Sequence, residues 1–338
     1  MSPPAALNFA EHLFALNRGR ASKTAYVDDH GTLSYGALEE RSRRFAAALL
    51  ASGLRSGERV LLVQLDTADW PVAFLGALFA GVVPVAVNTL LTADDYAYML
   101  EHCGARGVLA SGTLLPVLSQ AMARLSDAAA LPLIVSHPVA ELPEGARSMD
   151  SVIAEQAPLS APAATAAQDP AFWLYSSGST GRPKGTVHTH ASPWWTAELF
   201  GKPVLGLSEG DVCFSAAKLY FAYGLGNALT FPLSVGATVM LMAERPTPEA
   251  TFRRWTGVSA AMAEGEGAVT VRPSVFFGAP TGFAGMLASA GLPAREAVGL
   301  RMCSSAGEAL PGELAQRFKA HYGCDIIDGI GSTEMLHV

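Results

Sequence analysis

Hydrophobic residues in the first half of the chain follow two patterns in turn, helical spacing and short continuous apolar runs. Helical spacing predicts helices, each ended by a glycine, over residues 34–53, 71–81 and 92–104. The apolar runs predict buried strands over residues 58–65, 82–87, 107–111 and 131–138. Strands that alternate with helices of this length form a parallel sheet covered by helices, so the pattern predicts an α/β fold.

Residues 157–168 are expected to connect two parts of the chain. Pro, Ala and Ser dominate this stretch without periodicity, which is typical of a connector. A length of 338 residues suits about two domains. We therefore predict a first α/β subdomain over residues 1–160 and a second over residues 161–338. Further strands are predicted over residues 236–242 and 273–280, and a surface loop near residues 260–273.

Two uncharged runs, residues 70–93 and 219–243, are long enough to raise the question of a membrane span. Glycine and proline interrupt both runs, and acidic residues flank the first where a membrane span would carry Lys or Arg. We therefore expect buried core segments and no membrane partner.

Charge and cysteine content narrow the choice of partner and compartment. The chain carries 23 basic and 30 acidic residues, a formal net charge of −7, so no nucleic-acid partner is expected. Four widely spaced cysteines favour reduced thiols over a zinc site. The first residues lack a basic segment, and Glu11 interrupts the apolar stretch that a signal peptide would need. These features predict a cytoplasmic protein.

One loop concentrates the residue types that bind phosphate. Residues 175–185, YSSGSTGRPKG, follow a strand-like run and combine small hydroxyl residues, glycines and Lys184, one of only five lysines. Glycines let the backbone approach an anion, N–H groups and hydroxyls donate to phosphate oxygens, and a lysine adds positive charge. The order Pro-Lys-Gly excludes a Walker A loop. From composition alone, a flexible Ser/Gly surface loop remains the alternative.

The order of residues in this loop, SSGSTGRPKG, closely resembles the signature loop of the adenylate-forming superfamily. That superfamily includes acyl- and aryl-CoA ligases, luciferases and peptide-synthetase adenylation domains. The resemblance implies a loop that wraps the β- and γ-phosphates of ATP and releases pyrophosphate, with Lys184 in a catalytic role. The positions that it assigns to ATP are Ser177, Gly178, Ser179, Thr180, Gly181 and Lys184.

Two further segments resemble ATP-binding elements of the superfamily in the same order. Residues 304–310, SSAGEAL, resemble its adenosine-contacting loop, and residues 328–334, DGIGSTE, resemble its YGxTE segment with Ile330 in place of the usual tyrosine. Taken singly, Glu308 and Glu334 would be ordinary solvated carboxylates. The resemblance implies instead that Thr333 contacts the α-phosphate and that Glu334, near the phosphate loop, holds Mg²⁺ as a hard oxygen ligand. Both are expected catalytic residues. The other positions implied to bind ATP are Ser305, Ala306, Gly307, Glu308, Asp328, Gly329 and Ile330.

An aromatic and glycine-rich stretch between these motifs, residues 218–227, corresponds to the acid-pocket region of the superfamily. Ordinary core packing is the alternative for its aromatic residues, and a helix-face position without a ligand is the alternative for His337. With residues 276–281 the stretch would form a compact apolar slot for a flat aromatic ring. The expected pocket residues are Phe221, Ala222, Tyr223, Gly224, Gly278, Ala279, Gly331 and His337.

Segments spread along the whole chain, among them residues 88–102, 169–185 and 214–232, resemble the bacterial benzoate-CoA ligase group. The resemblance implies two stacked, helix-covered, mainly parallel sheets of the acyl-CoA synthetase large-domain type. It also implies an ATP-dependent aryl-CoA ligase for benzoate or a close relative. Such an enzyme forms benzoyl-AMP and then benzoyl-CoA, using ATP, Mg²⁺ and coenzyme A.

Members of that group continue beyond the position of Val338. They carry a ribose-binding TGD segment and a small C-terminal domain with a lysine that assists adenylation. We therefore expect this chain on its own to bind the aryl acid and to turn over little. Two other functions stay open: a non-catalytic module that binds an aryl acid or a nucleotide, and an adenylation domain that loads a carrier protein. The oligomeric state also stays open, with a homodimer as one option.

Overall fold

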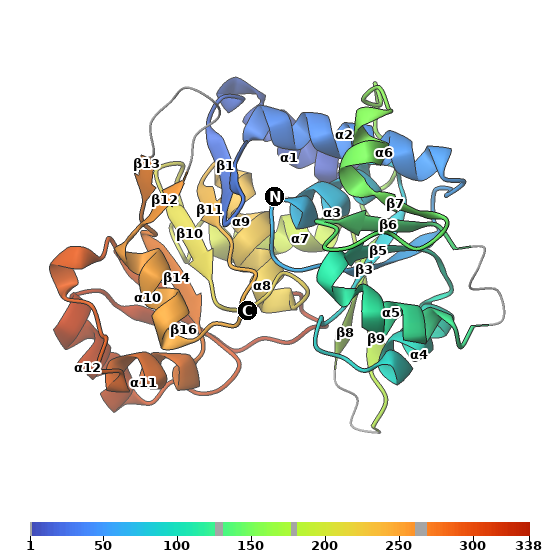
Figure 1. The fold of residues 1–338 in the computed structure, drawn as a ribbon. Coiled ribbons are helices and arrows are strands. Elements are labelled where there is room, and N and C mark those ends of the chain that lie inside the picture. Colours follow the sequence, from blue (N-terminus) through green and yellow to red (C-terminus); the bar gives the residue numbers. More distant parts are fainter. Residues whose placement is uncertain (1, 126–130, 177–180, 261–268) are drawn as a thin grey trace. The chain divides into compact units, whose positions relative to one another are not determined.

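The computed structural model describes residues 2–125, 131–176, 181–260 and 269–338 (Figure 1). Its contacts divide the chain into two compact units. Unit 1 comprises Met1–Ala15, Gly36–Leu65 and Asp69–Ser192, and unit 2 comprises Leu16–Tyr35, Asp66–Ala68 and Pro193–Val338. Each unit is built around its own mainly parallel sheet flanked by helices.

The sheet of unit 1 is made of β3 (Arg59–Val63), β4 (Val83–Ala86), β5 (Ala105–Ser111), β6 (Leu133–Ser136), β7 (Ala146–Ser148), β8 (Pro170–Ser176) and β9 (Lys184–Thr189). The strands lie in the order β7-β6-β5-β3-β4-β8-β9. Neighbours pair in parallel up to β8, and β9 pairs antiparallel with β8 at the edge. Val85 of β4 lies opposite Trp173 of β8, so the sheet extends beyond the connector at residues 157–168.

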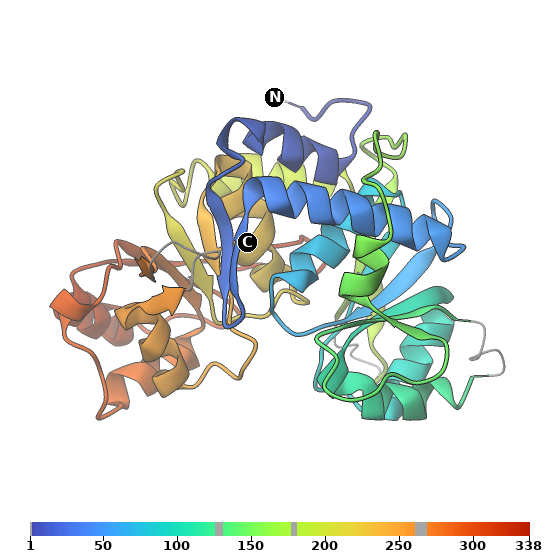
Figure 2. The ribbon, with the colours of Figure 1, turned by 45° about the horizontal axis from the view of Figure 1, so that its top comes forward.

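Helices cover both faces of this sheet. α4 (Ala93–Cys103) and α5 (Leu115–Met122) lie side by side on one face (Figures 1 and 2), where they pack against strand residues such as Val108. On the other face the fully buried α3 (Asp69–Phe79) places Phe74 edge-on to Phe172 of β8, with ring centroids 5.3 Å apart. Other α-helices lie wholly or partly in this unit: α1 (Phe9–Asn17), α2 (Tyr35–Ala51), α6 (Met149–Ala154) and α7 (Ala191–Thr196).

The elements predicted for the first half of the chain are present close to their predicted bounds. α4 illustrates why, because its ends are encoded locally. The Thr92 hydroxyl accepts a hydrogen bond from the backbone N–H of Asp95, whose carboxylate accepts one from the N–H of Thr92. At the other end Gly104 takes the left-handed conformation, with φ 58°, and stops the helix.

The boundary between the units differs from the one predicted at residues 160 and 161. The last crossing from unit 1 to unit 2 lies between Ser192 and Pro193, because β8 and β9 pair with the first sheet. In addition, Leu16–Tyr35 and Asp66–Ala68, which fall in the predicted first subdomain, belong to unit 2. Composition identified the connector at residues 157–168 correctly as an irregular segment. It carries no information about which sheet the next strand joins, and that choice decides the boundary.

The sheet of unit 2 is made of β1 (Thr24–Asp28), β2 (Gly31–Ser34), β10 (Val212–Ser215), β11 (Thr238–Met240), β14 (Val275–Gly278), β15 (Met302–Ser305) and β16 (Ile326–Asp328). Their order is β16-β15-β14-β10-β11-β1-β2. All neighbours are parallel except the β1–β2 hairpin at one edge. The predicted strands at 236–242 and 273–280 correspond to β11 and β14.

Alternate residues of these strands face opposite sides of the sheet. Phe214, Phe276 and Cys303 pack against α10 (Pro248–Thr256), α11 (Pro280–Ala288) and α12 (Gly312–Tyr322). Cys213 and Phe277 instead face the opposite core, which contains Phe231 of α9 (Phe231–Val235). α9 continues a helical stretch that starts with α8 (Ala222–Leu225) and passes through a π-helical turn over Gly226–Thr230.

Two further predictions, a surface loop near residues 260–273 and buried core segments in place of membrane spans, can be compared with the structure. The surface loop expected near residues 260–273 contains β13 (Val269–Val271), which pairs antiparallel with β12 (Val258–Ala260); residues 261–268 lie outside the described residues. The uncharged run 70–93 forms the buried α3 followed by β4, as predicted. Among the helices that the structure describes, none combines the length and hydropathy needed to cross a bilayer.

The close packing of α3 gives a test of the core. A Cβ atom at Gly76 would lie 2.7 Å from the carbonyl oxygen of Ser42 and 3.0 Å from Cδ1 of Phe45. We expect Gly76→Ala to lower the free energy of unfolding by about 1–3 kcal/mol through overpacking. The matched control is Gly285→Ala on α11, where no atom of the described residues, apart from the helix's own backbone and the two chain neighbours, lies within 4 Å of the added methyl group. It should stabilise by about 0.4–1 kcal/mol. Urea unfolding of both variants measures the difference, and equal effects would contradict the packing described.

Candidate functional site

The two arms of the predicted phosphate loop form the end of the β8–β9 hairpin in unit 1. Tyr175 pairs with Gly185, and Ser176 pairs with Lys184, whose side chain is exposed. Gly181, also exposed, takes a positive φ of 90°, which favours glycine. The predicted ATP ligands Ser177, Gly178, Ser179 and Thr180 lie outside the described residues. The expectation that Glu334 lies near them therefore stays a prediction.

The predicted adenosine loop begins where β15 ends in unit 2. Ser305 and Ala306 are buried, and the Ser305 hydroxyl has no hydrogen-bond partner among the described residues. Gly307, with φ 100°, then turns the chain outward. The exposed carboxylate of Glu308 accepts a hydrogen bond of 3.1 Å from the backbone N–H of Thr281, in the first turn of α11. This bond holds the loop against the start of that helix.

The start of the 328–334 segment lies beside the adenosine loop, because β15 and β16 are neighbouring parallel strands. The N–H of Gly329 donates to the carbonyl of Ser305 at 3.0 Å. Asp328, which is exposed, accepts from the N–H of Leu310 at 3.2 Å. The structure thus brings two predicted ATP segments together at the carboxyl ends of adjacent strands, where ligands bind in open α/β sheets.

The rest of this segment runs over the surface before it turns inward. Ile330 is 90% exposed, so it presents an uncovered apolar side chain at the position where the family usually has tyrosine. Thr333 is partly exposed and Glu334 is exposed. The N–H of Leu336 donates to the carbonyl of Thr333, and the positive φ of Leu336, 71°, directs the chain into the core.

His337 occupies an aromatic cluster. Its side chain is 2% exposed, and Nε2 lies 2.9 Å from Oδ1 of Asn227 in the π-helical turn. Its ring lies 4.5 Å from the ring of Phe231 and 5.0 Å from that of Tyr223, measured between centroids. Burial lowers the pKa of His337 to about 3, and a hydrogen bond to the backbone of Tyr223 acts in the opposite direction. The imidazole is therefore uncharged at neutral pH.

Glycines allow the chain to approach His337 closely. A Cβ atom at Gly226 would lie 2.3 Å from Cδ2 of His337, and one at Gly331 would lie 1.7 Å from its carbonyl oxygen. Because either contact is impossible, both glycines are needed for the observed position of the histidine. Of these two, the sequence prediction included only Gly331.

Only some of the predicted acid-pocket residues lie in or beside the cluster around His337. Tyr223 shares the cluster with His337, and its hydroxyl lies 3.2 Å from that of Ser304 on β15. Burial raises the pKa of Tyr223, which keeps its phenol uncharged. Gly278 and Ala279 follow at the carboxyl end of β14, where Gly278 pairs with Ser305. Phe221 is instead 44% exposed and its ring contacts that of Tyr220 with the planes tilted by 59°, so the structure does not place the Phe221 ring in the cluster. Ala222 and Gly224 are buried in α8.

Asn227 and Ser304 contact the cluster and lie within the predicted segments 218–227 and 304–310, but neither was among the expected site residues. Asn227 is completely buried in a mostly apolar helical stretch, and Ser304 is 1% exposed at the end of a buried strand. A buried polar residue needs a hydrogen-bond partner. An asparagine within the run 219–243 was therefore the available signal.

A magnesium ion that arrives with ATP would need fewer protein ligands than a resident metal ion. Within the described part of the chain, the acidic, histidine and cysteine side chains form no group of three that could hold a metal. Mg²⁺ is commonly held by one or two carboxylates together with substrate phosphates. The single exposed carboxylate of Glu334 suits that arrangement.

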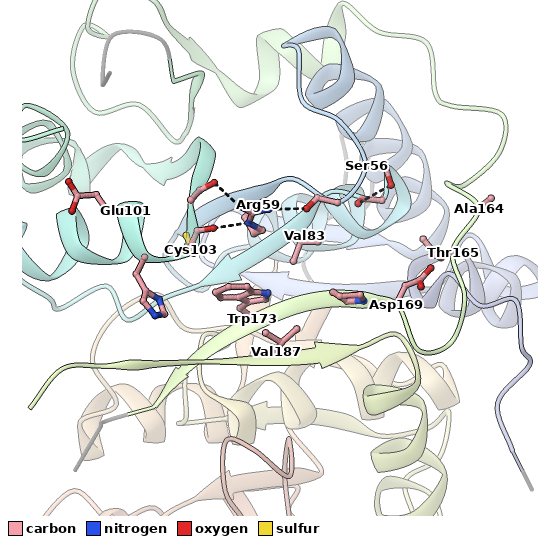
Figure 3. Close-up of a pocket in the computed structure, with 15 residues that line it drawn as sticks. Ser56, Arg59, Val83, Glu101, Cys103, Ala164, Thr165, Asp169, Trp173 and Val187 are labelled. Atoms are coloured by element: carbon pink, nitrogen blue, oxygen red, sulfur yellow. Dashed lines mark hydrogen bonds between the residues drawn. The ribbon is translucent and has the colours of Figure 1, made fainter. Parts of the chain in front are cut away.

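A separate cavity of about 650 Å³ lies in unit 1, and none of the predicted site residues lines it (Figure 3). Trp173 and Val187 form an apolar part of its wall. The guanidinium group of Arg59 points toward the turns around it and donates to the carbonyls of Gly57, Cys103 and Gly104. The guanidinium group of Arg59 therefore serves to hold the backbone of these turns in place.

Comparison with known proteins gives close relatives over the whole chain. The benzoate–CoA ligase of Thauera aromatica is 46% identical over 338 residues, which cover 99% of this chain and 60% of that protein. The 4-hydroxybenzoate–CoA/benzoate–CoA ligase of Rhodopseudomonas palustris is 42% identical, covering 99% and 58%. A crystal structure of a benzoate CoA ligase from Burkholderia xenovorans LB400 matches with a TM-score of 0.88 and 57% identity, covering 98% of this chain and 62% of that chain.

The chain therefore spans about 60% of the length of these relatives. The structural match confirms the predicted fold class, two mainly parallel sheets flanked by helices as in acyl-CoA synthetase large domains. The family model for AMP-binding enzymes matches residues 14–338, which include all three predicted ATP segments. The chain belongs to the family of AMP-binding enzymes.

Proposed function

We propose that this chain is the acid- and ATP-binding part of an ATP-dependent aryl-CoA ligase that acts on benzoate or a close relative. The observation that carries the proposal is the cluster around His337. It combines aromatic rings with an imidazole and a phenol that are both uncharged, beside the ends of β14 and β15. The names of the relatives at 46% and 42% identity support the same substrate class.

The acid side of the reaction follows from this chemistry. A flat ring packs well against aromatic side chains, and its carboxylate must point toward ATP. The run 219–243 contains no Lys or Arg. A second carboxylate on the ring would stay unpaired in an apolar setting, which is unfavourable. The pocket would therefore select aryl acids with one carboxylate and an otherwise neutral ring.

The nucleotide side uses charge placed at the exposed segments. Lys184 and the loop before it would bind the β- and γ-phosphates, and Thr333 would contact the α-phosphate. Glu334 would hold the Mg²⁺ that accompanies ATP. A carboxylate oxygen of the acid attacks the α-phosphorus, pyrophosphate leaves, and an aryl adenylate remains. Coenzyme A then attacks the acyl carbon through its thiolate and AMP leaves. Orientation and charge neutralisation supply most of the catalysis in the first step.

ATP and coenzyme A as substrates suit a cytoplasmic enzyme, which we also propose. The four cysteines, all buried free thiols, agree with a reducing compartment. A carrier protein in place of coenzyme A is the alternative thiol acceptor, and an aryl-acid or nucleotide-binding module without turnover is the alternative from another class. A homodimer stays one option for the assembly.

To test the proposed function, the full-length protein is incubated with ATP, Mg²⁺, coenzyme A and a panel of aryl acids. We expect benzoate to give benzoyl-CoA, pyrophosphate and AMP in equal amounts, and phthalate to give none. Pyrophosphate without benzoyl-CoA would favour a carrier protein as acceptor. Benzoate binding without pyrophosphate release would favour the binding module, and equal use of benzoate and phthalate would contradict the proposed pocket.

Lys184 provides the first mutational test. Removing a charged hydrogen-bond donor to phosphate commonly costs a factor of about 10–100. We expect Lys184→Ala to raise the KM for ATP by that factor and to leave benzoate affinity within twofold. Lys319→Ala is the control, because Lys319 is also an exposed lysine and pairs only with the exposed Asp325 in the described structure. An unchanged KM for ATP in Lys184→Ala would remove this residue from the site.

Glu334 provides the second test, because replacing it with glutamine removes the negative charge and keeps the shape of the side chain. Glu334→Gln should lower the rate of adenylation by about a hundredfold or more, the usual effect of losing one group that stabilises a charged transition state. Raising the Mg²⁺ concentration should restore part of the activity. The control is Glu313→Gln, an exposed glutamate in the first turn of α12. Activity that is equal to wild type across the Mg²⁺ range would exclude the proposed role.

The uncharged state of His337 predicts the pH dependence of acid binding. Its pKa of about 3 means that the imidazole carries no charge between pH 6 and pH 8, where benzoate remains ionised. The affinity for benzoate, measured by calorimetry, should therefore stay within twofold over this range. A cationic His337 would instead lose affinity as the pH rises, by about tenfold. A fall of that size which His337→Asn abolishes would contradict the structure.

A further inference from the structure

α4 is anchored at both ends and along one face. The capping box at Thr92 and the left-handed Gly104 define its ends. Arg59 of β3 donates through Nε to the carbonyl of Cys103 at 2.7 Å, in the last turn of the helix (Figure 3). Met99 and Cys103 are buried in the core of unit 1. α4 is therefore a fixed support for whatever its other residues contact.

Two aromatic side chains, Tyr98 and His102, leave α4 one turn apart. Residues four apart on a helix lie on the same side, and these rings stack with centroids 5.2 Å apart and planes inclined by 30°. Tyr98 is partly buried and His102 is exposed. Neither was a predicted site residue.

Tyr98 holds the arm of the phosphate loop that leads into β9. Its hydroxyl donates to the carbonyl of Pro183 at 3.2 Å, directly before Lys184. The guanidinium carbon of Arg182 lies 5.0 Å from the centre of the Tyr98 ring, within the range of a cation–π contact. One side chain of α4 thus contacts two successive residues beside the proposed phosphate-binding lysine.

His102 holds the opposite arm, at the end of β8. Its Nδ1 lies 2.8 Å from the hydroxyl of Tyr175, which pairs with Gly185 across the hairpin. A Cβ atom at Gly185 would lie 3.0 Å from the Trp173 ring and 3.5 Å from Cε1 of His102. The glycine therefore lets the hairpin lie close to both rings.

We propose that Tyr98 and His102 are positioning residues for the phosphate loop. One turn of an anchored helix holds both arms of the hairpin, so it fixes where the loop starts, where it ends and where Lys184 begins β9. The inference rests on the proposed role of this loop in ATP binding. The described residues that these contacts hold are Tyr175, Arg182 and Pro183, on either side of the loop, and holding them before ATP binds reduces the conformational entropy lost on binding.

The first test is Tyr98→Phe in the full-length protein, which removes only the hydroxyl bonded to Pro183. Losing one hydrogen bond should raise the KM for ATP by about threefold to tenfold. The KM for benzoate should change by less than twofold. The control is Tyr322→Phe, because the hydroxyl of Tyr322 also donates to a proline carbonyl, that of Pro293, at 3.2 Å. An ATP effect equal in both variants would overturn the proposal.

The second test uses His102 with a conservative rescue. His102→Ala should raise the KM for ATP, and His102→Asn should restore most of it, because an asparagine side chain can place a polar atom near the position of Nδ1. Tyr175→Phe should add little to His102→Ala, since both remove the same contact. A rescue that fails, or fully additive effects, would contradict the assigned pair.

A third measurement does not depend on the proposed function. Amide hydrogen exchange in the ligand-free protein should be at least about threefold faster at Arg182, Lys184 and Gly185 in His102→Ala than in wild type. If the protein makes no aryl adenylate but exchange accelerates, the proposed function fails and the positioning role stands. Unchanged exchange with unchanged ATP kinetics overturns the positioning role alone.

Discussion

Each unit depends on burying both faces of a parallel sheet. Helices occupy both sides of the strands, so the side chains of the sheet interior are buried against helices and cannot contact a ligand. Residues that bind or react must therefore lie at the strand ends or in the segments that follow them. The adenosine loop follows β15, the 328–334 segment follows β16, and the phosphate loop follows β8. These are the segments to which we assign ATP binding.

The same constraint separates neutral groups from charged ones. Buried positions near the strand ends, such as His337 and Tyr223, are held in their uncharged forms because burial penalises ionisation. Charged groups assigned to phosphate and magnesium, Lys184 and Glu334, are exposed on segments beyond the strands. This distribution suits a substrate pair of one neutral aromatic ring and one polyanion.

Much of the fold could be predicted from the sequence because its signals are local. The capping box at Thr92 and the left-handed Gly104 bound α4 without reference to the rest of the chain. The domain boundary could not be predicted, because the pairing of β4 with β8 is a long-range choice. Motif order predicted that the segments around Glu308 and Asp328 belong to one site, and the structure places them side by side. The contacts of Asn227 and of the Tyr98–His102 pair join distant segments, and no sequence spacing encodes such contacts.

We propose that the residues of these segments activate an aryl carboxylate with ATP before any thiol takes part. The most direct measurement is exchange of labelled pyrophosphate into ATP by the full-length protein, with and without benzoate and in the absence of coenzyme A. We expect exchange that requires benzoate and Mg²⁺ and that proceeds without coenzyme A. Exchange that is absent, or that appears only when coenzyme A is added, would contradict the proposal.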